Sequence, residues 1–164
     1  MIPVYFNFYS IGWLIAVAFN LVGAIFLFTI QNRSRAAFHL GMMFVTTGIF
    51  SFAYFIAASI YHPYAVMHRY FTIAFTLATT IHILQFFLSF PEDDYRKVRR
   101  VILACMWAGA ALVTLFFIYQ SLTATYVYLF HSHYWDVMLD DLSTRIGFVI
   151  LGYVVFTVSG GIWR

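Results

Sequence analysis

Five uncharged apolar stretches constrain this chain more than any other feature of its sequence. They lie at about residues 11–30, 37–60, 70–90, 101–120 and 146–162, and none contains Asp, Glu, Lys or Arg. A helix needs about 20 apolar residues to cross the hydrocarbon core of a bilayer, which is about 30 Å thick. One charged side chain at the centre of such a helix costs about 2.5–3.5 kcal/mol. The stretches therefore predict five transmembrane helices.

Composition supports this interpretation and excludes two other classes of protein. Of the 164 residues, 63% are apolar or aromatic and only 9% are charged. A soluble domain is roughly a quarter charged, and a disordered chain is poor in apolar residues, so neither class fits. The single cysteine, Cys105, excludes a disulfide framework. A net charge of +3, spread along the chain, does not favour a nucleic-acid partner. We expect an all-α integral membrane bundle in a lipid bilayer.

The basic residues are divided unevenly between the two sides that alternating helices create. Seven fall on one side: Arg33, Arg35, Arg96, Lys97, Arg99, Arg100 and Arg164. The other side has only Arg69 and Arg145. Because cytoplasmic loops carry an excess of Lys and Arg, the N-terminus is expected outside and the C-terminus in the cytoplasm.

The ends of the chain and its longest loop give three further expectations. Residues 1–10 contain no Lys or Arg, and no small-residue cleavage site follows the first apolar stretch, so that helix should remain in the mature protein. Residues 1–164 are expected to form one transmembrane domain. The abrupt end at the cytoplasmic interface favours an N-terminal part of a longer protein, although a complete protein would look the same. The aromatic loop at residues 121–145 suggests a short helix lying on the surface.

The third apolar stretch contains the highest density of polar residues. Thr72, Thr76, Thr79 and His82 follow one another in steps of three and four, which places them along one side of a helix. Two interpretations remain open, a polar pocket or relay centred on His82 and a set of interhelical hydrogen bonds. The predicted intramembrane polar residues are Asn20, Thr76, Thr79, His82 and Gln85, with Asn20 as a partner across the bundle.

A second group of polar and aromatic residues belongs to the predicted outer end. We predict a ligand-binding region there formed by His62, Tyr64, His68, His131, His133, Trp135 and Asp136. Imidazole and carboxylate groups can bind zinc or copper, but a His-x-His spacing fixes no geometry, so we predict no metal and no other cofactor. Proton sensing by these histidines is a further hypothesis, because histidine titrates near neutral pH.

Tyrosine is also concentrated at the predicted outer end. Nine of the twelve tyrosines fall at or beyond it: Tyr5, Tyr9, Tyr61, Tyr64, Tyr70, Tyr119, Tyr126, Tyr128 and Tyr134. An aromatic belt at the membrane interface explains many of them. A belt should form at both interfaces, however, so an aromatic-lined outer cleft is the alternative.

Several short motifs resemble one family of bacterial signalling proteins. They are Asn32-Arg33-Ser34-Arg35, Phe38-His39-Leu40-Gly41, Tyr61-His62-Pro63, Phe90-Pro91-Glu92 and His133-Tyr134-Trp135-Asp136, together with the aromatic N-terminal tail. The chain resembles the membrane region of the "histidine kinase N-terminal 7TM" type, in which seven helices precede a cytoplasmic kinase, serine phosphatase or nucleotide cyclase domain. The resemblance implies the first five helices of such an input module, in the bacterial inner membrane.

Three functions are compatible with these observations. The first is a sensor that passes an outer or intramembrane cue, a small ligand or a proton, to a cytoplasmic output domain in cis or to a partner protein, either as a monomer or as a homodimer. The second is a small b-type haem protein. Its deep histidines, His39 and His82, are expected at different depths, which disfavours one haem between them, and a haem near the outer histidines is the alternative. The third is a transporter fragment or accessory subunit. No catalytic constellation is present, so we do not expect this segment to be an enzyme, although a following domain could be one.

Overall fold

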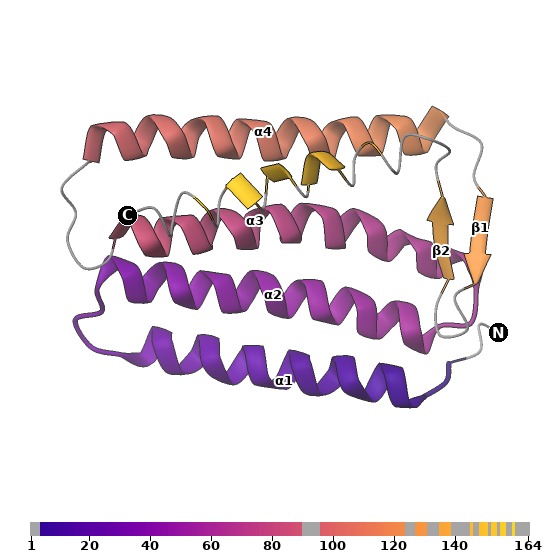
Figure 1. The fold of residues 1–164 in the computed structure, drawn as a ribbon. Helices are drawn as coiled ribbons and strands as arrows, with labels where there is room; N and C mark the ends of the chain where they lie inside the picture. The colour runs from indigo at the N-terminus through magenta and orange to yellow at the C-terminus, as the bar shows by residue number, and fades with distance from the viewer. Residues whose placement is uncertain are drawn as a thin grey trace.

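The structure, a computed structural model, describes residues 4–89, 96–123, 127–130 and 135–138, together with residues 145, 148–150, 152, 153, 155, 156 and 159. Its main elements are four helices that run up and down side by side: α1 (Phe8–Thr29), α2 (Arg35–Ser59), α3 (His68–Ser89) and α4 (Arg96–Thr123) (Figure 1). A short 3₁₀ helix, η1 (Pro63–Met67), leads into α3. Strands β1 (Val127–Phe130) and β2 (Trp135–Met138) follow α4.

Four helical segments are long and apolar enough to cross a membrane. They are Phe8–Thr29, Arg35–Ser59, Pro63–Ser89 and Arg100–Tyr119. The expectation of helices long and apolar enough to cross a membrane is therefore confirmed for four of the five predicted spans. The expected fifth span, 146–162, is described only in part; its described residues between 148 and 159 are helical.

The helices begin slightly before the apolar stretches because polar residues cap them. At the start of α1, the Ser10 N–H donates to Asn7 Oδ1 at 2.7 Å, and the Asn7 N–H donates to Ser10 Oγ at 2.9 Å. At the start of α2, the Ala37 N–H donates to Ser34 Oγ at 3.1 Å. Such caps satisfy N–H groups that have no partner within the helix. Between the two helices, Asn32 adopts the left-handed conformation, with φ of 55°, that asparagine tolerates well.

Helix α2 lies between α1 and α3, which pack on its opposite faces. Gly41 and Phe44 belong to the α1 side, because a Cβ on Gly41 would lie 2.9 Å from Phe28, and a Cβ on Gly23 would lie 3.0 Å from Phe44. Thr46 belongs to the α3 side, where it contacts Thr79. The four helices therefore follow their chain order, as a row (Figure 1).

The apolar core lies between α3 and α4. Its buried members are Ile73, Leu77, Ile81, Leu84, Met106, Ala110 and Phe117. Two described residues of the C-terminal segment, Ile150 and Tyr153, pack against this core, and the Tyr153 hydroxyl donates to the Met106 carbonyl oxygen at 3.3 Å. The described pieces of this segment lie beside α3 and α4 in Figure 1.

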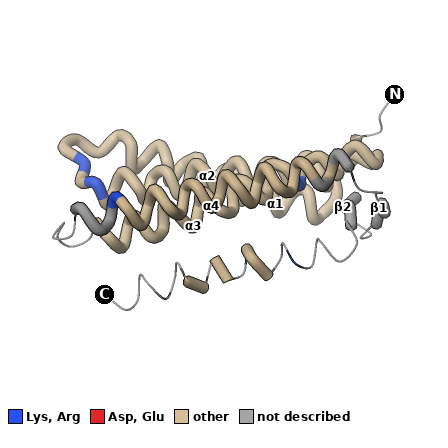
Figure 2. Tube along the Cα trace, turned by 90° about the horizontal axis from the view of Figure 1, so that it is seen from above, with Lys and Arg blue, Asp and Glu red and all other residues tan. Residues whose placement is uncertain are grey.

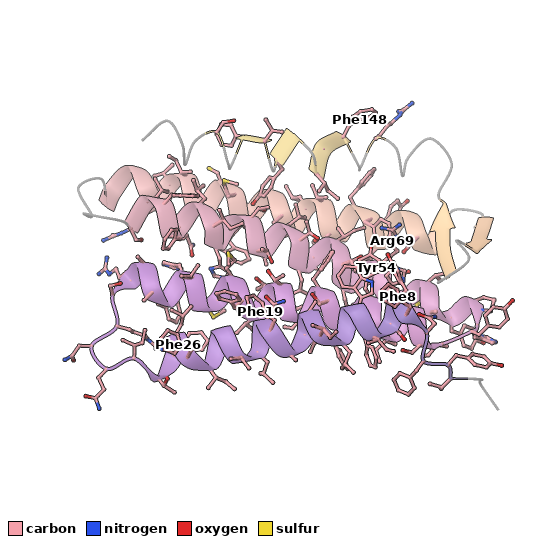
Figure 3. All side chains as sticks on the ribbon, turned by 60° about the horizontal axis from the view of Figure 1, so that its bottom comes forward. Phe8, Phe19, Phe26, Tyr54, Arg69 and Phe148 are labelled. Atoms are coloured by element: carbon pink, nitrogen blue, oxygen red, sulfur yellow. The ribbon has the colours of Figure 1, made fainter. Side chains whose placement is uncertain are left out.

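Large apolar side chains cover the outer face of α1. Phe8, Phe19 and Phe26 are 93%, 68% and 66% exposed, and Figure 3 labels all three on this helix. Exposed apolar surface of this extent is typical of a membrane or protein–protein interaction site. On a helix long and apolar enough to cross a membrane, this face is suited to contact with lipid.

The loop after α4 differs from expectation. We predicted a short surface helix within residues 121–145, but the described part forms an antiparallel hairpin in which Val127 is opposite Met138 and Phe130 is opposite Trp135. The prediction was wrong because the two segments, Val-Tyr-Leu-Phe and Trp-Asp-Val-Met, are rich in the β-branched and aromatic residues that favour strands.

Candidate functional site

A cavity lies between α2, η1 and the start of α3. Its volume is about 270 Å³, and it is lined by ten residues that are mostly apolar: Ile49, Phe52, Ala53, Ile56, Ile60, Tyr64, Ala65, Met67, His68 and Phe71. We call it the η1 cavity. Its size falls just below the roughly 300 Å³ at which small-molecule pockets begin. Two predicted ligand-binding residues, Tyr64 and His68, contribute to its wall.

His68 is held rigidly in this wall. It is 4% exposed, its Nδ1–H donates to the Ala65 carbonyl oxygen at 2.8 Å, and its ring centroid lies 5.0 Å from that of Tyr54. The Trp13 ring also stacks on Tyr54, with the two centroids 4.7 Å apart. An aromatic chain therefore joins α1, α2 and α3 at the end of the bundle where α1 begins, close to Tyr54 in Figure 3. The sequence offered no signal for Trp13 or Tyr54 beyond their aromatic character.

His62 and Tyr64 form the entry to η1. The Tyr64 N–H donates to His62 Nδ1 at 3.1 Å, so the imidazole caps the short helix, and Pro63 occupies its first position. The two rings lie 4.5 Å apart. Tyr64 is 69% exposed, which leaves its ring accessible at the rim of the η1 cavity. His62 does not line the η1 cavity, but it caps the short helix that does.

The remaining predicted ligand-binding residues belong to the hairpin. His131 and His133 lie outside the described residues. Trp135 and Asp136 lie in β2, of which the backbone is described, and β2 contacts η1. The structure thus brings the strand that contains Trp135 and Asp136 to the same end of the molecule as His62, Tyr64 and His68.

The intramembrane polar residues meet mainly between α2 and α3. The Thr79 hydroxyl donates to Thr46 Oγ1 at 2.8 Å, and the Thr46 hydroxyl lies 3.0 Å from the carbonyl oxygens of both Met42 and Met43. Thr76, on the same helix as Thr79, is half-buried. An interhelical hydrogen bond is thus present for one of the predicted threonines.

Asn20 does not take the predicted role of a partner across the bundle. Its amide donates to the Ala16 carbonyl oxygen within α1 at 2.7 Å. It also lines a second cavity, of about 250 Å³, between α1 and α2, with Ala24 and Phe44 among its neighbours. The reason is the row arrangement, in which α2 separates α1 from α3.

His39 and His82 lie beside each other, although the sequence predicted different depths for them. Their ring centroids are 5.8 Å apart with an interplanar angle of 27°. His39 is four residues inside α2 and His82 is seven residues from the end of α3, a difference of about 4.5 Å at 1.5 Å per residue. Two imidazole side chains span that difference, so unequal depths do not keep the rings apart. We call these residues the histidine pair.

Other side chains surround the histidine pair closely. The His82 Nδ1–H donates to Gln85 Oε1 at 3.1 Å, the Trp107 ring lies 5.7 Å from His82, and the Phe38 ring lies 5.3 Å from His39. A haem bound by both imidazoles would need its porphyrin disc in the plane between them, where α2 and α3 pack on each other. A haem between the two rings would therefore require α2 and α3 to separate. Trp107 was not singled out from the sequence.

The arginines near the membrane surfaces lie at opposite ends of the bundle. Arg33 and Arg35 are at the connection of α1 to α2, and Arg100 is near the start of α4, so these three share one end (Figure 2). Arg69, at the start of α3, lies at the other end and follows His68 of the cavity wall directly in the chain (Figure 3). Arg33 lies over the rings of Phe28 and Phe38, at 5.1 and 5.2 Å from their centroids.

Comparison with known proteins adds no relative from which a function could be transferred. No family model, no curated protein and no solved structure matches the chain. The geometry of the η1 cavity and of the histidine pair is therefore the basis for any functional inference.

Proposed function

We propose that this chain is the membrane sensor region of a bacterial signal-transduction protein, of the histidine kinase N-terminal seven-helix type. In this proposal it belongs to the inner membrane, its N-terminus is outside, and residues 146–162 form a fifth span that leads to the cytoplasm. A cue at the outer end alters the packing of the helices. The altered packing is transmitted to an output domain in cis or to a partner protein.

One observation carries the proposal: the same two helices form the η1 cavity at one end and the histidine pair at the other. An occupant of the cavity touches Phe52 and Ile56 of α2 and Phe71 of α3. It therefore has a different affinity for different spacings of α2 and α3. Differential affinity is the condition under which a ligand shifts a conformational equilibrium.

The lining of the cavity indicates the class of ligand. Most of the wall is aliphatic or aromatic, while Tyr64 and His68 supply the polar groups. Such a site suits a small amphipathic molecule with an apolar body and one polar group. Protonation of a histidine at this end is the second cue that the composition of the site favours.

A distance between α2 and α3, measured at the end of the bundle away from the η1 cavity, tests the proposal. Spin labels at Gln31→Cys and Phe87→Cys, in a Cys105→Ser background, report the spacing of the start of α2 and the end of α3. The protein is placed in lipid nanodiscs, and decanoate or decanol serves as the amphipathic probe. We expect the probe to change the distance distribution.

Two cavity-filling variants provide the matched comparison. Ala53→Leu fills part of the η1 cavity and should abolish the change, whereas Ala24→Leu fills the cavity between α1 and α2 and should preserve it. A distribution that responds neither to the probes nor to acidification below about pH 6.5, the ordinary pKa of histidine, would contradict the sensor proposal. An equal response in both variants would show that the cue does not act through the η1 cavity.

A further inference from the structure

The cavity between α1 and α2 has a single amide group in an otherwise apolar wall. We call it the α1–α2 cavity, and its volume is about 250 Å³. Of the nine described residues that line it, Asn20 alone has a polar side chain. The others are Val17, Leu21, Ala24, Phe44, Val45, Gly48, Ile49 and Phe52. We infer that this cavity binds a small ring molecule with one hydroxyl group, of the phenol class, that is dissolved in the membrane.

The amide of Asn20 has an oxygen that is free to accept a hydrogen bond. Its nitrogen donates at 2.7 Å to the carbonyl oxygen of Ala16, which only accepts, so Oδ1 is the other arm of the amide. No group in the described part of the chain donates to this oxygen. Asn20 is 7% exposed, and a buried acceptor without a donor is costly. A hydroxyl group in the cavity supplies the missing donor.

The position of the cavity indicates where the ligand comes from. Asn20 is near the middle of α1 and Gly48 is near the middle of α2, and a Cβ on Gly48 would lie 3.4 Å from the Asn20 Cβ. The middle of a membrane-crossing helix lies about 15 Å from the headgroups, since the hydrocarbon core is about 30 Å thick. Leu21 and Phe52 of the wall are about half exposed, so the cavity opens on the outer surface of the helix pair. The ligand therefore enters from the hydrocarbon region of the bilayer.

The size and lining of the cavity favour a ring with a hydroxyl group. A cavity of about 150 Å³ lined by Leu, Ile and Phe binds benzene, so the larger α1–α2 cavity has room for a ring with a small substituent. Phe44 and Phe52 offer aromatic faces to such a ring. A hydroxyl group can donate to Asn20 Oδ1 and accept from the second N–H of the amide. A ketone or an ether lacks the donor that Oδ1 requires.

The α1–α2 cavity is separate from the site of the proposed sensor function. Ile49 and Phe52 belong to the walls of both cavities, but the described lining of the α1–α2 cavity includes no residue of α3. An occupant therefore contacts α1 and α2 without bridging α2 and α3. The inference goes beyond the proposed function and does not depend on it.

Two fluorinated probes that differ by one hydroxyl group test the inference on the full chain in detergent micelles. They are para-trifluoromethylphenol and trifluoromethylbenzene, and fluorine NMR gives the dissociation constant of each. Asn20→Leu keeps the approximate size of the side chain and removes the amide. We expect it to weaken binding of the phenol about 3–10-fold, the equivalent of one neutral hydrogen bond, and to leave the affinity of trifluoromethylbenzene unchanged. Comparison of the two probes in both proteins cancels their different partitioning into the micelle.

Two cavity-filling variants show which cavity the probes occupy. Ala24→Leu fills part of the α1–α2 cavity and should weaken binding of both probes. Ala53 lines the η1 cavity and not the α1–α2 cavity, so Ala53→Leu should preserve the effect of Asn20→Leu on the phenol. Loss of that effect in the Ala53→Leu background would place the phenol in the η1 cavity and overturn the inference.

A measurement on the unaltered chain covers the case in which Asn20→Leu does not fold. Nuclear Overhauser effects should connect the ring protons of the bound phenol with the Ala24 methyl group, because Ala24 lines the cavity. Three further results would overturn the inference: no binding of the phenol by the wild type, equal changes for both probes in a folded Asn20→Leu variant, or no Overhauser effect to Ala24.

Discussion

Single hydroxyl groups join α2 to α3 in a region where most contacts are apolar. The Thr79 hydroxyl donates to Thr46 Oγ1, and the Thr46 hydroxyl is itself close to two backbone carbonyl oxygens of its own helix. This hydrogen bond lies between the histidine pair and the η1 cavity along the same two helices. It fixes the register of α2 against α3 and with it the position of His82 beside His39.

A double-mutant cycle with Thr46→Val and Thr79→Val measures this hydrogen bond. Valine keeps the shape of threonine and removes the hydroxyl, so we expect a coupling energy of about 0.6 kcal/mol, with an upper limit near 2 kcal/mol. The measurement is the free energy of unfolding in micelles for the two single variants and the double variant. Thr114→Val is the control, because its hydroxyl donates to Ala110 within α4. Strictly additive effects of the two substitutions would show that the hydrogen bond contributes nothing.

Arg33 stabilises the connection between α1 and α2 through two aromatic rings. Its guanidinium carbon lies 5.1 Å from the Phe28 centroid and 5.2 Å from the Phe38 centroid. We expect Arg33→Gln to lower the free energy of unfolding by about 0.5–1 kcal/mol, the range of exposed cation–π interactions. In a Phe38→Leu background the same substitution should cost less. An equal cost in both backgrounds would assign the effect to the charge alone.

The polar residues show which part of the site the sequence could predict. Spacing by three and four residues correctly placed Thr79 and His82 on one side of their helix, because helical periodicity is a local property. It could not identify Thr46 or His39 as their neighbours. Those contacts depend on the offset between two antiparallel helices, which is determined by η1 and by the early start of α2 at Arg35.

Glycine allows α1 and α2 to approach closely. A Cβ on Gly23 would lie 3.0 Å from the Cδ1 and Cε1 atoms of Phe44 and 3.2 Å from its Cγ. The Cγ atom is near the backbone of α2, so the ring cannot avoid the new methyl group by rotation alone. The described contacts of α1 are made mainly with α2, and this interface therefore positions the first helix.

Gly23→Ala should reduce stability, whereas Gly12→Ala should not. Overpacking at an interface typically costs about 1–3 kcal/mol, so Gly23→Ala should reduce the free energy of unfolding even though alanine favours a helix. No heavy atom lies within 4 Å of a Cβ on Gly12, so Gly12→Ala should be neutral or stabilising by up to about 1 kcal/mol. Unfolding in micelles, followed by circular dichroism, measures both. A stabilising Gly23→Ala substitution would contradict the packing described for α1.

The helices were more predictable than the hairpin. Each predicted apolar stretch is helical in its described residues, because the bilayer demands about 20 apolar residues whatever surrounds them. The segment at residues 121–145 has no such constraint. Its strands depend on pairing between Val127–Phe130 and Trp135–Met138, and on the contact of β2 with η1. The periodicity of one segment does not show which other segment it pairs with.

In the row of four helices, the two central helices differ from α1 in the contacts that their side chains make. Central helices α2 and α3 hold the histidine pair and the Thr46–Thr79 hydrogen bond, while α1 presents large apolar side chains outward. The sequence predicted a bundle but not the order of its helices, because apolar helices carry no signal for their lateral order. The row explains why Asn20, on α1, lines a cavity with α2 and does not reach α3.

The distribution of arginine along the bundle predicts how the molecule crosses the membrane. Arg33, Arg35 and Arg100 share one end, and Arg69 lies at the other (Figure 2). The positive-inside rule therefore predicts that the end with three arginines is cytoplasmic. In a Cys105→Ser background, Tyr64→Cys on η1 should react with a membrane-impermeant maleimide on intact cells. Gln31→Cys, between α1 and α2, should react only after permeabilisation.

A third position makes this accessibility experiment decisive. Leu112 is 68% exposed on α4 inside a membrane-crossing segment, so Leu112→Cys should resist the reagent before and after permeabilisation. Labelling of Gln31→Cys, and not of Tyr64→Cys, on intact cells would reverse the orientation. The η1 cavity would then face the cytoplasm, and an occupant would have to come from inside the cell. The same experiment thus decides on which side of the membrane the proposed sensor meets its cue.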